Sequence, residues 1–170
     1  MNRIAKFEKV SFEQFRESLI DDYADAPDKI KDMYDKLQIP KRATAQSAGY
    51  DFCTPFDIRL NPGQTVKVPT GIRARMGEDW VLMIFPRSGL GFKYRLQLNN
   101  TVGIIDSDYY YSDNEGHIFI KITNDSNEGK TVDIKAGSGF AQGVFVPYGI
   151  TEDDEVSNIR NGGFGSTDKA

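Results

Sequence analysis

The feature that most constrains the fold is a series of short apolar or alternating segments between residues 43 and 147. In residues 66–76 mostly apolar side chains alternate with polar ones, which is the two-residue period of a strand. Residues 80–85 form a continuous apolar run typical of a buried strand, and turn residues precede both segments. Further strands are expected at residues 96–98, 101–105, 117–123, 131–134 and 143–147. Many short strands separated by turns predict a mainly β, jelly-roll-like barrel or sandwich.

A helical hairpin is predicted before these strands, after an irregular strand at residues 3–10. Residues 11–14 (SFEQ) fit a capping box, with Ser11 as the N-cap and Gln14 returning to the backbone. The first helix places apolar side chains on one face, namely Phe12, Phe15, Leu19, Ile20 and Tyr23. The second helix starts near Pro27 and ends before Pro40, and its apolar face comprises Ile30, Met33, Tyr34 and Leu37. The hairpin, residues 11–38, is acidic outside and apolar inside. It either packs on its own domain or offers a surface for a protein partner.

Composition narrows the class of protein. A length of 170 residues predicts one domain (1–170), and 39% hydrophobic with 27% charged residues is ordinary for a soluble globule. No apolar run is long enough to span a membrane, and the first ten residues lack the apolar core of a signal peptide, so we expect a cytoplasmic protein. A single cysteine and a single histidine exclude a disulfide framework and a zinc site of ordinary composition. The net charge of -4 argues against binding to nucleic acid without sequence specificity.

Residues 151–170 are acidic and then glycine-rich, which predicts a mobile arm at the C-terminal end.

Three segments carry side chains suited to a phosphorylated ligand. Asp106 follows the strand expected at residues 101–105, where we expect a half-desolvated carboxylate that could act as a general base. A plain turn also favours aspartate. Arg87, Ser88 and Gly89 follow the strand at 80–85 and form either an anion cradle or an ordinary turn. Residues 160–167 (RNGGFGST) could contact phosphate oxygens and stack an aromatic ring on a base, or could be a solubilising tail. The sequence contains neither a P-loop nor a dinucleotide-binding GxGxxG motif after a strand.

Five segments match, in order, the motifs of one enzyme family. They are residues 48–52 (AGYDF), 86–90 (PRSGL), 103–109 (GIIDSDY), 140–144 (FAQGV) and 160–167 (RNGGFGST). Together they resemble the trimeric deoxyuridine triphosphatase (dUTPase) family, and the resemblance covers residues 43–167. It implies that water attacks the α-phosphorus of dUTP, releasing dUMP and pyrophosphate, and that Asp106 orients and activates this water.

The resemblance also implies roles for other residues. The phosphate contacts would come from Arg87, Ser88, Gly89 and Gln142, and the uracil contacts from Asn100, Thr101 and Gly103. Tyr109 would pack under the sugar and leave no room for a ribose 2′-hydroxyl. Asp51 would support the water network around Mg²⁺, which is expected on the triphosphate oxygens without direct protein ligands. The arm of a neighbouring subunit in a homotrimer would close over the ligand through Arg160, Phe164, Gly165, Ser166 and Thr167.

The chain departs from the family pattern in three places. Tyr110 and an insert reaching Gly116 replace the usual Arg-Gly after Tyr109, the arm is one residue shorter than usual between Arg160 and Phe164, and Asp168 stands where a glycine is usual. The hairpin at residues 11–38 lies outside the common core. Two alternatives follow: a dCTP deaminase-like enzyme, whose second motif resembles RSS rather than RSG, and a dUTPase-fold protein with an added regulatory, protein-binding role through residues 11–38.

Overall fold

The protein, described here by a computed structural model, is built mainly from antiparallel strands. The structure describes residues 2–23 and 26–157. The strands are β1 (Ala5–Lys9), β2 (Lys41–Arg42), β3 (Tyr50–Cys53), β4 (Ile58–Leu60), β5 (Thr65–Pro69), β6 (Ile72–Met76), β7 (Trp80–Pro86), β8 (Leu96–Leu98), β9 (Gly103–Ile105), β10 (Phe119–Asn124), β11 (Val132–Ile134) and β12 (Gly139–Pro147). The helices are α1 (Phe12–Glu17), α2 (Pro27–Asp35), α3 (Ser88–Tyr94) and the 3-10 helix η1 (Ser107–Tyr111).

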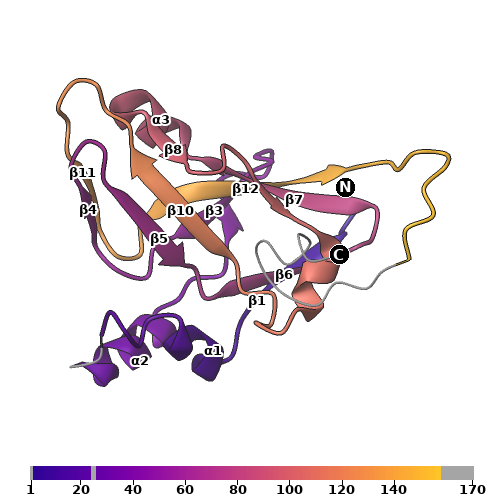
Figure 1. Cartoon of the computed structure of the whole chain (residues 1–170), viewed down its shortest axis with the longest axis horizontal. Helices are drawn as coiled ribbons and strands as arrows, with labels where there is room; N and C mark the ends of the chain where they lie inside the picture. Colours follow the sequence, from indigo (N-terminus) through magenta and orange to yellow (C-terminus); the bar gives the residue numbers. More distant parts are fainter. Residues whose placement is uncertain (1, 24–25, 158–170) are drawn as a thin grey trace.

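The strands form sandwich-like sheets around one main core. A five-stranded sheet has the order β2-β3-β12-β7-β9, and a three-stranded sheet has the order β5-β10-β8. Two short ribbons, β1-β6 and β11-β4, complete the β structure of the described residues. Figure 1 shows these strands above the helices α1 and α2. The expected mainly β, jelly-roll-like architecture is therefore confirmed, as a sandwich without a closed barrel among the described residues.

The alternating pattern of β10 shows how the sequence builds this core. Ile118, Ile120 and Ile122 are at most 2% exposed, and Ile120 and Ile122 face Val68 and Val66 across the ladder with β5. Burying such a row of β-branched side chains on one face is the main source of sheet stability. None of the helices in the described part of the chain is long and apolar enough to cross a membrane.

The single strand expected at residues 66–76 is two strands in different sheets. β5 pairs with β10, whereas β6 pairs with β1. The break lies at Gly71, which has a φ of +69°, a left-handed conformation that glycine adopts without the strain that a Cβ causes. A Cβ at Gly71 would also collide with the side chain of Leu37. Alternation continues across the break, so periodicity alone could not reveal it.

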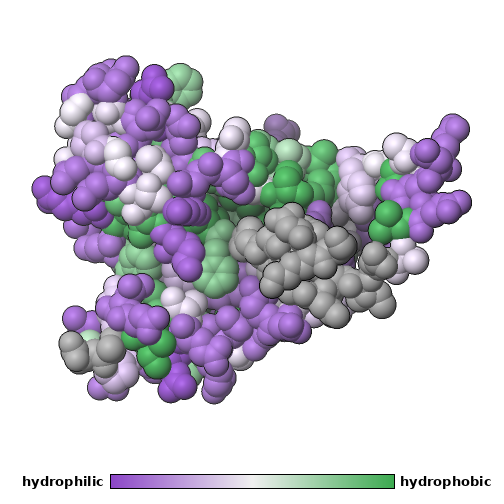
Figure 2. All heavy atoms as spheres, viewed as in Figure 1, coloured by the Kyte–Doolittle hydropathy of each residue, from purple (hydrophilic) through white to green (hydrophobic). Residues whose placement is uncertain are grey.

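The helical hairpin packs on the β structure of its own chain. Val10, Phe15, Leu19 and Ile30 form a second buried cluster, and Phe56 packs against both this cluster and the main core. Ile20 is 44% exposed and does not share the buried face, because α1 ends at Glu17 and turns follow. The outer surface is mostly hydrophilic in Figure 2 and acidic in balance, because residues 11–38 contain more Asp and Glu than Lys and Arg, although lysine–aspartate pairs link successive turns of α2.

Candidate active site

The phosphate side of the candidate site gathers on three neighbouring strand segments. Arg87 follows β7, Asp51 lies on β3, and Gln142 lies on β12 between them. The Nε atom of Arg87 is 3.2 Å from Oδ1 of Asp51, and its Nη1 donates to the carbonyl of Gly139 at 3.3 Å. The side-chain amide of Gln142 donates to the carbonyl of Pro86 at 3.2 Å. These bonds orient a guanidinium that is 43% exposed and so able to contact an anion.

Two glycines make room for this cluster. A Cβ at Gly49 would lie 2.6 Å from Oε1 of Gln142, and one at Gly139 would lie 2.8 Å from Nη1 of Arg87. Such distances are below van der Waals contact, so larger residues would displace both polar side chains. Gly139 lies outside the second and fourth motifs, and no local pattern in the sequence marks it as a partner of Arg87.

The segment after β7, expected to form either an anion cradle or an ordinary turn, is the start of a helix. Arg87 is the N-cap of α3, with Ser88 and Gly89 in its first turn. Backbone N–H groups in a first helical turn have no intrahelical acceptor, so they can donate hydrogen bonds to the oxygen atoms of an anion. Ser88 and Gly89 are exposed, and a Cβ at Gly89 would meet no atom within 4 Å. The segment is thus the start of a helix, and its role as an anion cradle stays a prediction.

Asp106 directly follows β9 and is the N-cap of η1. It is exposed in the chain, so the expectation of a half-desolvated carboxylate is wrong for one isolated copy. β9 ends at the edge of the five-stranded sheet, with one neighbour, β7, and this position leaves the residue after it at the surface. The sequence pattern shows that Asp106 follows a buried strand, but it does not show how exposed its side chain is.

Asp106 and Arg87 lie at opposite ends of β7. Ile105 pairs with Leu82, so Asp106 is one residue beyond Leu82 in one direction, whereas Arg87 is five residues beyond it in the other. At about 3.3 Å per strand residue, the two are about 20 Å apart. Figure 1 shows α3 at the upper left and the short helix after β9 at the lower right. One chain therefore does not bring the two side chains together.

The expected uracil-binding residues lie in the connection between β8 and β9. Asn100 and Thr101 are exposed, and Thr101 has a φ of +66°. The backbone N–H of Thr101 donates to the carbonyl of Leu98, and that of Val102 donates to the carbonyl of Asn100. A Cβ at Gly103 would lie 3.1 Å from Cβ of Ile84, so glycine allows close packing on β7.

Tyr109 is part of the main core. Its side chain is 3% exposed, and its hydroxyl donates to the carbonyl of His117 at 2.7 Å. In the single chain, little of the ring surface is therefore accessible to a sugar, and its expected sugar contact stays a prediction. The residues Arg160, Phe164, Gly165, Ser166 and Thr167 lie outside the described residues.

A sequence model of the dUTPase family matches residues 35–168. The chain belongs to the dUTPase family.

Curated relatives of the dUTPase family agree with this assignment. The deoxyuridine 5'-triphosphate nucleotidohydrolase of Lactococcus lactis is 42% identical over 134 residues, which cover 77% of this chain and 88% of the relative. The enzyme of the same name from Bordetella parapertussis is 39% identical over 150 residues, covering 84% of this chain and 96% of the relative. The family match begins at Asp35, so α1 and most of α2 precede it.

Solved dUTPase structures share the fold. The dUTPase from Streptococcus mutans superposes with a TM-score of 0.64 at 37% identity, covering 86% of this chain and 98% of that one. The dUTPase from phage phi11 of S. aureus superposes with a TM-score of 0.62 at 21% identity, covering 92% of this chain and 97% of that one, and at this identity it supports the fold alone.

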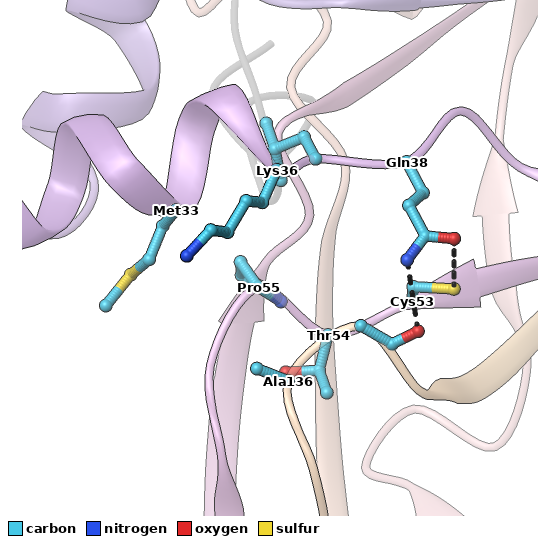
Figure 3. Close-up of a pocket in the computed structure, with 9 residues that line it drawn as sticks. Met33, Lys36, Gln38, Cys53, Thr54, Pro55 and Ala136 are labelled. Atoms are coloured by element: carbon cyan, nitrogen blue, oxygen red, sulfur yellow. Dashed lines mark hydrogen bonds between the residues drawn. The ribbon is translucent and has the colours of Figure 1, made fainter.

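A cavity of about 370 Å³ lies between α2 and the end of β3, and none of the residues expected in the dUTPase site lines it. Figure 3 shows Met33 and Lys36 on its helical side and Cys53, Thr54 and Pro55 opposite them. The side chain of Gln38 donates to the carbonyl of Gly137 at 3.3 Å, and its Oε1 is 3.9 Å from the Cys53 sulfur. Burial, with the nearby carboxylate of Asp51, raises the pKa of the Cys53 thiol.

Proposed function

We propose that the chain hydrolyses dUTP to dUMP and pyrophosphate, with Asp106 as the base that activates the attacking water. Membership of the dUTPase family carries this proposal. Asp106 supports it because it lies on rigid backbone at the end of β9 and is exposed to a ligand. In the reaction the water oxygen bonds to the α-phosphorus, its proton passes to the Asp106 carboxylate, and the bond from the α-phosphorus to the bridging oxygen breaks.

The active site is proposed to form between copies of the chain in a homotrimer. The separation of about 20 Å between Asp106 and Arg87 along β7 supports this, because it is too long for both to act at one α-phosphate. A second copy would supply Arg87 to the nucleotide held by Asp106. The arm residues expected to close over the ligand (Arg160, Phe164, Gly165, Ser166 and Thr167) would come from a neighbouring copy as well.

The phosphates are proposed to bind at the start of α3. Arg87 would contact the phosphate oxygens as a guanidinium already oriented by Asp51 and Gly139, so that little reorganisation accompanies binding. Ser88, Gly89 and Gln142 would supply further donors. Asp51 acts here as the ion-pair partner of Arg87, which gives it a more direct supporting role than the water network expected from the resemblance.

The base and sugar are proposed to bind at the β8–β9 connection. Asn100 and Thr101 are exposed, Val102 is half-buried and Gly103 is buried, and exposed groups of this connection could pair with the uracil edge as a complementary base does. Cytosine would then place donors against donors, which costs binding free energy. Tyr109 would limit the space beside the sugar.

Mg²⁺ is proposed to bind through the phosphate oxygens of the substrate. Among residues 2–23 and 26–157, no group of three or more His, Cys, Asp and Glu side chains is placed to hold a metal ion. Mg²⁺ binds readily to phosphate oxygens and keeps several waters. Bound there, it would neutralise charge on the triphosphate. A dUTPase variant from phage phi11 of S. aureus is described with a structural Mg(II) ion.

Pyrophosphate release from a panel of nucleoside triphosphates tests the proposal. We expect release from dUTP with Mg²⁺ and little from UTP, dCTP or dTTP. Absence of release from dUTP contradicts the proposal, and ammonia release from dCTP would support the dCTP deaminase alternative. A protein partner at residues 11–38 stays a prediction, checked by whether a deletion of that segment changes the set of bound proteins.

A further inference from the structure

A carboxylate distant in sequence completes the cap of the first helix. The hydroxyl of Ser11 accepts the backbone N–H of Gln14 at 3.1 Å, as the predicted capping box requires. The second half of that box is different, because the backbone N–H of Ser11 donates to Oε2 of Glu115 at 2.7 Å, not to Gln14. The Ser11 hydroxyl donates to Oε1 of Glu115 at 2.6 Å. Glu115 thus binds the helix start through both carboxylate oxygens across 104 residues of sequence.

The backbone at Glu115 is held in an unfavourable conformation. Glu115 has a φ of +59°, which is uncommon for a residue with a Cβ and is retained only where surrounding contacts enforce it. Gly116 follows with a φ of +71°, and a Cβ there would lie 2.7 Å from the Cα of Tyr110. The end of the insert is therefore folded tightly against its own beginning at Tyr110.

Hydrogen bonds continue from this turn to the proposed base. The side-chain amide of Asn114 donates to the hydroxyl of Tyr109 at 2.8 Å, and that hydroxyl donates to the carbonyl of His117. The backbone N–H of Ser112 donates to the carbonyl of Tyr109. The N–H of Tyr109 donates to the carbonyl of Asp106 at 3.2 Å. A continuous set of contacts thus joins α1 to Asp106.

The insert is also fastened to β1 and β6. The hydroxyl of Tyr110 donates to Oε2 of Glu8 at 2.6 Å, and the guanidinium of Arg73 lies 4.5 Å from the centre of the Tyr110 ring. Figure 1 shows the segment after the 3-10 helix returning past β1 toward α1. The two features outside the family pattern, the helical hairpin and the insert, therefore contact each other directly.

We propose that Glu115 is a positioning residue for dUTP hydrolysis: by binding Ser11 it uses the helical hairpin to hold residues 107–116, and with them Asp106, in the geometry for attack. The proposal rests on the proposed function of Asp106. Burial of Glu115 disfavours its ionised form, but the hydrogen bonds from Ser11 outweigh burial and lower the pKa of Glu115. The link therefore uses a charged acceptor, which forms the stronger class of hydrogen bond.

Three variants and one control test the link. Glu115→Gln leaves one acceptor oxygen and places an amide donor against Ser11, and Ser11→Ala removes the hydroxyl from the same contact. Ser11→Thr keeps the hydroxyl, so it should retain the kcat of the wild-type chain. Glu13→Gln is the matched control, because Glu13 is an exposed carboxylate in the first turn of α1. We expect kcat for dUTP to fall about tenfold in the first two variants, with a smaller change in KM, since misplacing a reacting group mainly slows the chemical step.

Backbone amide hydrogen exchange gives a second readout that does not depend on activity. We expect faster exchange over residues 107–116 in Glu115→Gln and Ser11→Ala, and unchanged exchange in β4 and β11. Unchanged kcat and unchanged exchange at 107–116, in variants that melt cooperatively, would overturn the proposal. Faster exchange with unchanged kcat would also overturn it, because the contact would then be structural only. Failure of the proposed function is distinguishable, because the wild-type chain itself would then release no pyrophosphate from dUTP. Failure of the positioning role would appear only when the variants are compared with an active wild-type chain.

Discussion

The imidazole Nε2 of His117 accepts a hydrogen bond of 2.9 Å from the backbone N–H of Gly71, where β5 and β6 part. His117 is 0% exposed, and within the described residues its Nδ1 atom is buried without a hydrogen-bond partner. Burial lowers the pKa of His117 to about 4, although the carboxylate of Glu115 acts in the opposite direction. The imidazole is therefore neutral in the folded chain at neutral pH, which is the state that can accept from Gly71.

We predict that acid destabilises the fold through His117. The unfolded chain takes up a proton on this side chain near pH 6.5, whereas the folded chain does so only near pH 4. The contribution of His117 to the free energy of unfolding is therefore fully present above pH 6.5 and falls as the pH is lowered toward 4. The loss from this group is on the order of 2 kcal/mol. Urea unfolding at pH 7 and pH 4.5 measures the change. His117→Gln keeps an acceptor but does not titrate, so its free energy of unfolding should depend less on pH; equal dependence in both chains contradicts the prediction.

Asp106→Asn should lower kcat for dUTP by roughly 10²–10⁴-fold, because the amide cannot take the proton from water. Ligand binding should change little, since an amide preserves size and polarity. Pyrophosphate release and equilibrium binding of a non-hydrolysable dUTP analogue measure the two effects. Asp113→Asn, an exposed carboxylate in the same insert, is the control and should retain wild-type turnover. Wild-type turnover in Asp106→Asn would falsify the assignment of the base.

Arg87→Lys should lower kcat/KM for dUTP about 10- to 100-fold, because lysine cannot hold the bonds to Asp51 and Gly139 while contacting phosphate. The free energy of unfolding should change by less than about 1 kcal/mol, since the ion pair is partly exposed. Steady-state kinetics and urea unfolding check the two parts. Arg95→Lys, in the Arg95–Asp125 pair elsewhere on the surface, is the control. A similar kinetic loss in both variants would mean that Arg87 has no special role.

Mixing two inactive chains should restore activity if sites form between copies. Asp106→Asn and Arg87→Ala each remove one half of the proposed site, and the halves lie about 20 Å apart in one chain. Refolding the two variants together should produce assemblies in which some sites combine an intact Asp106 with an intact Arg87. Pyrophosphate release above that of either variant alone is the expected result. If the mixture is no more active than its components, both residues act from the same copy.

Deleting residues 152–170 should remove most of the dUTP-hydrolysing activity. The deleted segment contains the residues expected to close over the ligand, and closure excludes bulk water from the reacting phosphate. The rest of the chain should melt as before, because the main core is made of residues up to Ala141. Kinetics and thermal melting of the truncated chain provide the measurement. Retained activity would show that the arm is dispensable.

Local patterns predicted much of this fold correctly. Ile118, Ile120 and Ile122 alternate in the sequence and are buried in the structure, and Ser11 caps α1 as its residue type indicates. One local expectation was wrong where a distant residue contributed to the outcome. Residues 66–76 divide at Gly71, where a Cβ would collide with the side chain of Leu37. The short strands β2, β3 and β4 were missed, since few residues carry each pattern.

The sequence by itself determined the mainly β architecture, the dUTPase family and the identity of the candidate site residues, because short-range periodicity and ordered motifs are properties of the chain alone. Only the tertiary structure decided that Asp51 pairs with Arg87, that Asp106 lies exposed at the other end of β7, and that Glu115 caps a helix 104 residues away. The physical reason is that strand register and loop packing bring together groups whose separation along the chain carries no local signal.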